Sequence, residues 1–302
     1  MYRVNRKLLL TSLRVHPAWF IAGLTFLTLM ATAGFRSAPS VLILPLEEAF
    51  GWGRDGISLA VSINVLLYGL TAPFAAALME RFGIKRVVMV ALATVGSGAL
   101  LTVFMNSLWQ LIALWGFVVG VGTGSMALVF AASIVNRWFV ERKGLVIGAL
   151  TAAAATGQLI FLPTLSTFAI TYGWKSVSIT VGIAALVMVP LIYILLPERP
   201  SDIGVRPFGA QEDWQAPSQI KGNAAALAVN TLREAVRVKN FWYLVISFFV
   251  CGLSTSGLIG THFIPAAHDH GMMEVAAASL LALIGVFDVV GTLFSGWLTD
   301  RI

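Results

Sequence analysis

The sequence predicts an all-α integral membrane protein, for three reasons. Hydrophobic residues make up 58% of the 302 residues and charged residues only 11%, whereas a soluble domain typically carries about 25% charged residues. Several hydrophobic runs are long enough to cross a membrane as helices, which takes about 20 mostly apolar residues. The basic residues gather in alternate connecting segments, as they do in proteins that cross a membrane repeatedly.

Eight hydrophobic runs are expected to form eight membrane helices, with one long polar segment after the sixth. The runs occupy residues 17–46, 57–79, 87–105, 108–135, 144–171, 176–196, 241–264 and 275–298. The polar segment begins with Pro197, which stops a helix, and it contains Thr231 and Glu234 at the spacing of a capping box. We therefore expect a six-helix bundle at 1–196, a cytoplasmic linker with a short surface helix at 197–240, and the start of a second bundle at 241–302.

The distribution of charge predicts the orientation of these helices. A cytoplasmic N-terminus puts residues 1–16, 80–86, 136–143, 197–240 and the C-terminal tip inside. Only Arg36, Arg54 and Lys175 of the 20 Lys and Arg residues then lie elsewhere. This asymmetry follows the positive-inside rule, so we expect a multi-pass protein of the cell inner (plasma) membrane with its N-terminus in the cytoplasm. The membrane topology also accounts for the net charge of +6. The excess of basic residues therefore does not indicate a nucleic-acid partner, and we predict none.

An inexact repeat relates the end of the second run to the end of the eighth. The first copy is Ala76-Ala77-Leu78-Met79-Glu80-Arg81, and the second, Gly296-Trp297-Leu298-Thr299-Asp300-Arg301, follows 220 positions later. A repeat at this spacing in so apolar a chain indicates two halves built alike. The first copy leads into a further hydrophobic run, whereas the sequence stops at Ile302. We therefore expect a six-plus-six plan that is truncated after the eighth helix.

Residues 76–86 resemble the signature of the major facilitator superfamily, Gly-x-Leu-x-Asp-Arg-x-Gly-x-Arg/Lys-Arg, with Ala76 for Gly and Glu80 for Asp. The second copy matches that signature as far as it goes. Stretches at 45–52, 136–144 and 287–290 resemble the bacterial monocarboxylate-porter branch. The resemblance implies a major facilitator fold and secondary transport by alternating access. It also implies a conformational latch between the halves on the cytoplasmic side, formed by Glu80, Arg81, Gly83, Arg86, Asp300 and Arg301.

Arg36 and Asp288 are charged residues well inside hydrophobic runs. A charge at the centre of a membrane costs about 2.5–3.5 kcal/mol on insertion scales, so such residues usually face a cavity or a partner. Arg36 could instead extend to the membrane interface, and Asp288 could form a structural hydrogen bond between helices.

The resemblance assigns roles to both residues. Monocarboxylate porters carry a basic residue close to the position of Arg36 that handles substrate and protons, and an aspartate that Asp288 matches. We therefore expect Arg36 to bind a carboxylate and Asp288 to couple a proton. We also expect Asp288 to be buried, and to be protonated when its cavity is closed to water. In animal members an arginine follows the aspartate by four positions, where this chain has Thr292. Further candidates for substrate binding are Asn64, Tyr68 and Gln158.

Other features point to packing rather than chemistry. Gly116, Gly120, Gly122 and Gly124 are expected to allow close helix packing in the fourth span. His268-Asp269-His270 lies in an expected outer loop without a third ligand at fixed spacing, so we interpret it as a solvated loop and predict no metal site. No nucleotide loop or catalytic motif is present, so we predict no enzyme activity and no cofactor.

The sequence thus favours a carrier that moves a small organic anion, such as a monocarboxylate, with a proton. Two alternatives stay open. One is efflux of hydrophobic compounds, and the other is a membrane sensor or partner protein that has the fold without transport.

Overall fold

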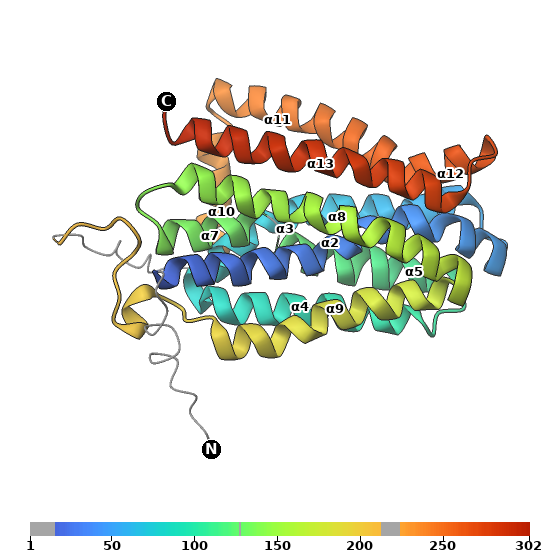
Figure 1. The fold of residues 1–302 in the computed structure, drawn as a ribbon, viewed down its shortest axis with the longest axis horizontal. Helices are drawn as coiled ribbons and strands as arrows, with labels where there is room; N and C mark the ends of the chain where they lie inside the picture. The colour runs from blue at the N-terminus through green and yellow to red at the C-terminus, as the bar shows by residue number, and fades with distance from the viewer. Residues whose placement is uncertain (1–15, 127, 213–223) are drawn as a thin grey trace, which may run out of the picture.

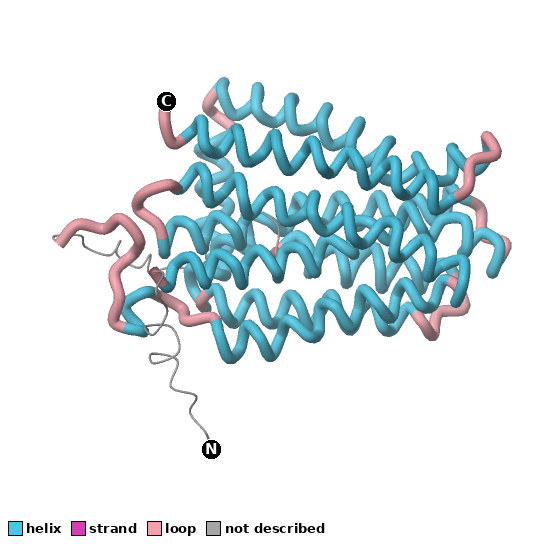
Figure 2. The backbone as a smooth tube through the Cα atoms, viewed as in Figure 1, coloured by secondary structure: helices cyan, strands magenta, loops and turns pink. Residues whose placement is uncertain are grey.

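The structure, a computed structural model, describes residues 16–126, 128–212 and 224–302 (Figure 1). In these ranges eight helical stretches are long and apolar enough to cross a membrane. Each coincides with one of the hydrophobic runs of the sequence, so the predicted all-α membrane fold is confirmed. Figure 2 shows that most loops lie at the two ends of a bundle of roughly aligned helices.

Six of the eight spans are single helices. They are α2 (Pro17–Phe50), α3 (Arg54–Phe82), α4 (Ile84–Thr102), α8 (Lys143–Tyr172), α9 (Trp174–Leu195) and α13 (Glu274–Thr299). The first span is longer than its hydrophobic run, because α2 continues to Phe50 and ends only at Gly51. Gly51 takes the left-handed conformation, with φ of 66°, and its N–H bonds to the carbonyl of Glu47.

The fourth and seventh spans are interrupted. The fourth consists of α5 (Leu108–Leu111), the π-helix η1 (Ile112–Val119), α6 (Gly120–Gly124) and α7 (Leu128–Trp138). The seventh consists of α11 (Lys239–Cys251), the π-helix η3 (Gly252–Ile259) and α12 (Gly260–Asp269). A π-helical stretch widens a helix locally and is often found at functional sites.

The connecting segments divide the bundle into two ends. The start of α2, the linker up to residue 212 and the C-terminus lie at one end in Figure 1, together with α10 (Ala224–Ala235). We call this the inner end, after the charge rule. The end of α12 and the start of α5 lie at the opposite, outer end.

Glycines bring the fourth span close to its neighbours. A Cβ on Gly116 would lie 3.1 Å from the carbonyl oxygen of Ala60, and one on Gly120 would lie 3.0 Å from the Cα of Asn64. Both contacts are with α3, and Gly124 also faces that helix, whereas Gly122 faces α4. The predicted packing role of these four glycines is therefore confirmed.

The surface helix predicted for the linker is α10, which packs against α3 through Ala228 and Ala77. It begins at Ala224, so Thr231 and Glu234 lie inside it and do not form its first turn. The capping-box interpretation was therefore wrong, because the alanine-rich stretch before Thr231 is itself helical.

The first part of the linker is fixed to the inner end by Phe208. Its backbone N–H donates to the carbonyl of Trp138, the last residue of α7, and its carbonyl accepts from the Val140 N–H in the loop before α8, each at 2.8 Å. Its ring packs edge-on against His16 and Trp19 at the start of α2. Nδ1 of His16 accepts a hydrogen bond from the Ala18 N–H and caps α2. Burial lowers the pKa of His16, and this favours the neutral form of the ring, whose Nδ1 can accept. A hydrogen bond to the Arg206 backbone raises the pKa and offsets part of this effect.

Candidate functional site

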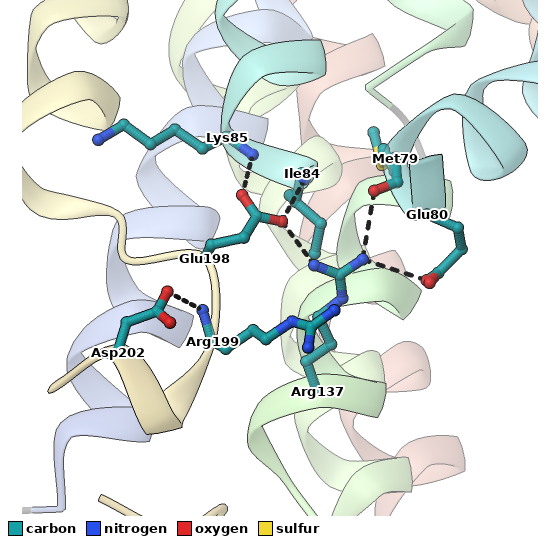
Figure 3. Close-up of polar contacts among 8 residues, drawn as sticks. All are labelled: Met79, Glu80, Ile84, Lys85, Arg137, Glu198, Arg199 and Asp202. Carbon is teal, nitrogen blue, oxygen red and sulfur yellow. Dashed lines mark hydrogen bonds and ion pairs between the residues drawn. The ribbon is translucent and has the colours of Figure 1, made fainter. Parts of the chain in front are cut away.

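A cluster of charged side chains lies at the inner end, where α3, α4, α7 and the segment after α9 meet (Figure 3). Arg137, in the last turn of α7, forms ion pairs with Glu198 and with Glu80, the second at 3.2 Å. It also donates a hydrogen bond to the carbonyl of Met79. The Arg137 side chain is only 14% exposed and that of Glu198 30%. Truncating Arg137 would leave the partly buried carboxylate of Glu198 without its cationic partner, which is destabilising.

Glu198 also caps α4. Its carboxylate accepts hydrogen bonds from the backbone N–H of Ile84 at 2.6 Å and of Lys85 at 3.1 Å. The unpaired N–H groups and the dipole of a helix N-terminus favour an anion there. Gly83 makes this approach possible, because its φ of +93° suits glycine and a Cβ would lie 2.8 Å from the Glu198 carboxylate.

A second carboxylate caps α8 and joins the first six spans to the last two. Oδ1 of Asp300 accepts a hydrogen bond from the Gly144 N–H and Oδ2 accepts one from the Leu145 N–H, both at 2.7 Å. The helices approach closely here, since a Cβ on Gly144 would lie 2.5 Å from the Gly296 carbonyl oxygen. The repeat of the signature predicts this contact, because it places the second copy against the start of the fifth span, and the structure confirms it.

The other residues of the predicted latch do not all meet. The guanidinium of Arg81 lies over Phe82, 5.1 Å from the ring centroid, and that of Arg301 lies over Trp297 at 4.5 Å. Arg86 is exposed. Glu80 and Gly83 therefore belong to the Arg137 cluster, and Asp300 makes the contact between the two parts of the chain.

Arg36 lies in the middle of the first span. Because α2 continues to Phe50, Arg36 is 14 residues, or about 21 Å, from its outer end. Its side chain is exposed, although its neighbours Phe35 and Ser37 are buried. The guanidinium carbon lies 5.4 Å from the ring centroid of Tyr68 on α3, within range of a cation–π contact.

Asn64 and Gln158 differ in their surroundings. The amide of Asn64 donates a hydrogen bond of 2.7 Å to the Trp115 carbonyl in η1, so it joins α3 to the π-helical stretch. Gln158 is half-buried on α8, next to Gly157, which packs against α2 at Met30 and Ala33. The structure thus brings Arg36 and Tyr68 into contact and gives Asn64 a structural partner.

Asp288 is exposed in this structure, and the burial expected for it is not found. It lies three residues, or about 60° around the helix, from Gly285, which packs against Ala155 of α8. This places Asp288 at the margin of the helix face that contacts α8. Thr292 lies in that contact, since a Cβ on Gly148 would be 2.4 Å from its carbonyl oxygen.

The outer end holds an ion pair that the sequence analysis missed. Asp269 is the last residue of α12 and is bound by Arg54, the first residue of α3. The interpretation of His268-Asp269-His270 as a solvated loop was wrong as to the loop, because His268 and Asp269 end α12. Asp269 is exposed as expected, but it also pairs with a basic residue 215 positions away. Within the described residues, no group of three His, Cys, Asp or Glu side chains could hold a metal ion.

The fold has counterparts in known proteins. The chain matches the Major Facilitator Superfamily over residues 24–302, and it belongs to that superfamily. A crystal structure of D-xylose-proton symporter matches with a TM-score of 0.62, over 94% of this chain and 69% of that chain, at 14% sequence identity. At this identity the likeness concerns the fold, and it agrees with the predicted major facilitator fold.

Relatives by sequence are named as transporters. The uncharacterized MFS-type transporter YcxA of Bacillus subtilis is 25% identical, over 93% of this chain and 65% of the relative. The uncharacterized MFS-type transporter YhjX of Escherichia coli is 29% identical, over 85% of this chain and 58% of the relative. Mouse monocarboxylate transporter 11 is 25% identical, over 94% of this chain and 59% of the relative. The chain thus spans less than two thirds of the length of these relatives.

Sequence reasoning missed Arg137 and Glu198 as well as the outer pair. One signal was available, because Glu198 follows directly after Pro197 at the end of the sixth run. In the folded chain that acid meets the start of α4 and the last turn of α7.

Proposed function

We propose that the chain forms part of a secondary transporter that works by alternating access and moves a small monocarboxylate with a proton. The observation that carries the substrate class is Arg36. It is an exposed guanidinium in the middle of a membrane span, on a stretch whose neighbouring side chains are buried. A guanidinium binds a carboxylate through two parallel hydrogen bonds. The relatives named monocarboxylate transporters support the same class.

We propose that Tyr68 and Asp288 act together with Arg36 in the transport of substrate and proton. Tyr68 holds the Arg36 guanidinium from one side through its ring, and Asn64 and Gln158 line neighbouring levels of α3 and α8. Asp288 is a carboxyl group in the middle of the eighth span, and such residues in carriers serve as proton relays. We propose that Asp288 takes up a proton with the substrate, inside a six-plus-six bundle in the inner membrane.

Uptake by the full-length protein in proteoliposomes tests this function. Labelled lactate or pyruvate should accumulate when the lumen is more alkaline than the medium, and a protonophore should abolish the accumulation. Asp288→Asn should lose gradient-driven accumulation but keep exchange of labelled for unlabelled substrate, whereas the matched control Glu48→Gln should behave as wild type. The proposal fails if no carboxylate enters, or if Asp288→Asn concentrates substrate at the wild-type level.

A further inference from the structure

Arg54 at the outer end binds two carboxylates that come from different parts of the chain. Its Nη1 and Nη2 donate to Oδ2 and Oδ1 of Asp269 at 2.6 and 2.9 Å, in a bidentate arrangement. Its Nε donates to Glu47 at 2.8 Å. The side chains are about two-fifths exposed, so water can replace either partner when the contact opens.

The two acids differ in what they connect. Glu47 is near the end of α2, and Arg54 begins the adjacent α3, so their pair stays within the first six spans. Asp269 ends α12, so its pair with Arg54 joins the first six spans to the last two at the outer end. At the inner end, Asp300 makes the corresponding junction through the start of α8.

Between these junctions, α8 and α13 pack almost backbone to backbone. Gly144 and Gly148 contact Gly296 and the Thr292 carbonyl, and farther toward the outer end Gly285 contacts Ala155. Small residues let these helices pack closely along much of their length, so an opening motion that keeps this contact is a tilt about the seam. A tilt that opens the outer end would separate Arg54 from Asp269.

We propose that Arg54 and Asp269 form the latch of the outer gate, and that Glu47 holds the Arg54 guanidinium when the gate is open. The proposal rests on alternating access as proposed above, and not on the identity of the substrate. Because Arg54 exchanges one of its two carboxylate partners for water, the cost of opening stays small. Exposed ion pairs contribute little individually, which suits a contact that must break and re-form in each cycle.

Glu47 offers a matched control, because it is an acid bound to the same guanidinium that does not bridge the two parts. The test uses the full-length protein in right-side-out vesicles, otherwise free of cysteine, with Ile264→Cys as reporter. Ile264 lies on α12 and is 1% exposed in the closed arrangement. A membrane-impermeant maleimide then reports how often the outer end opens.

Asp269→Asn and Arg54→Gln should each raise the labelling rate of Ile264→Cys roughly two- to five-fold, the size expected for one exposed pair. Arg54→Lys should lie between wild type and Arg54→Gln, since it keeps the charge but loses the bidentate fork. Glu47→Gln should leave the rate at or below the wild-type value. Equal acceleration by Glu47→Gln and Asp269→Asn would overturn the proposal, as would no acceleration by either. The readout needs no transported substrate, so failure of the monocarboxylate proposal would leave this test intact.

Discussion

Asp300→Asn tests how much one carboxylate contributes to closing the inner end. The wild-type side chain accepts hydrogen bonds from the Gly144 and Leu145 N–H groups at 2.7 Å each. Asparagine keeps one acceptor oxygen but loses the second and the negative charge that the helix N-terminus favours. Loss of a negative charge at an exposed helix N-terminus costs about 0.3–1 kcal/mol, and Asp300 is exposed to solvent. The inner-closed population should fall up to about five-fold relative to the open one.

Pulsed electron–electron double resonance on the full-length protein measures that population directly. Spin labels at Val140→Cys, in the loop before α8, and at Ile302→Cys report the distance between the inner ends of α8 and α13. Both side chains are exposed in the structure. Asp300→Asn should increase the long-distance component, whereas Arg301→Gln should not, because the Arg301 guanidinium lies over Trp297 of α13. Identical distance distributions in wild type and Asp300→Asn would show that the carboxylate does not hold this end closed.

Two further predictions concern packing and orientation. Gly148→Ala should lower the free energy of unfolding in detergent by about 1–3 kcal/mol, because the added Cβ would lie 2.4 Å from the Thr292 carbonyl oxygen. Gly23→Ala, where nothing lies within 4 Å, should leave stability unchanged or raise it, and an equal loss in both variants would contradict the packing argument. For orientation, an impermeant maleimide outside the cell should label His270→Cys but not Ser201→Cys, because the charge asymmetry puts the linker inside. The reverse pattern would refute that topology.

The helices could be predicted from the sequence because lipid imposes a local rule. Each span needs about 20 apolar residues, and that requirement is visible without knowledge of its neighbours. The contact of Asp300 with α8 could also be predicted, since the repeat marks Asp300 and places the second copy of the signature against the first bundle. Both inferences rely on patterns that are continuous along the chain.

The ion pairs could not be predicted in the same way. Arg137 meets Glu198 from 61 positions away and Arg54 meets Asp269 from 215 positions away, and only the packing of the helices brings these side chains together. The exposure of Asp288 also depends on packing. The face of α13 that contacts α8 is formed by small residues such as Gly285 and Gly296, and Asp288 falls at its margin. The widened turns in η1 and η3 had no signal in the hydrophobic pattern.

The most direct test of the account is the dependence of uptake on Arg36. In the full-length protein, Arg36→Ala should reduce the apparent affinity for lactate by about 10- to 100-fold, as expected for loss of a charged hydrogen-bonding contact. Arg36→Lys should retain part of the affinity, and Lys175→Ala, which removes a cation at the outer end, should transport as wild type. Wild-type affinity in correctly inserted Arg36→Ala would contradict the account, because the guanidinium would then have no part in binding the carboxylate.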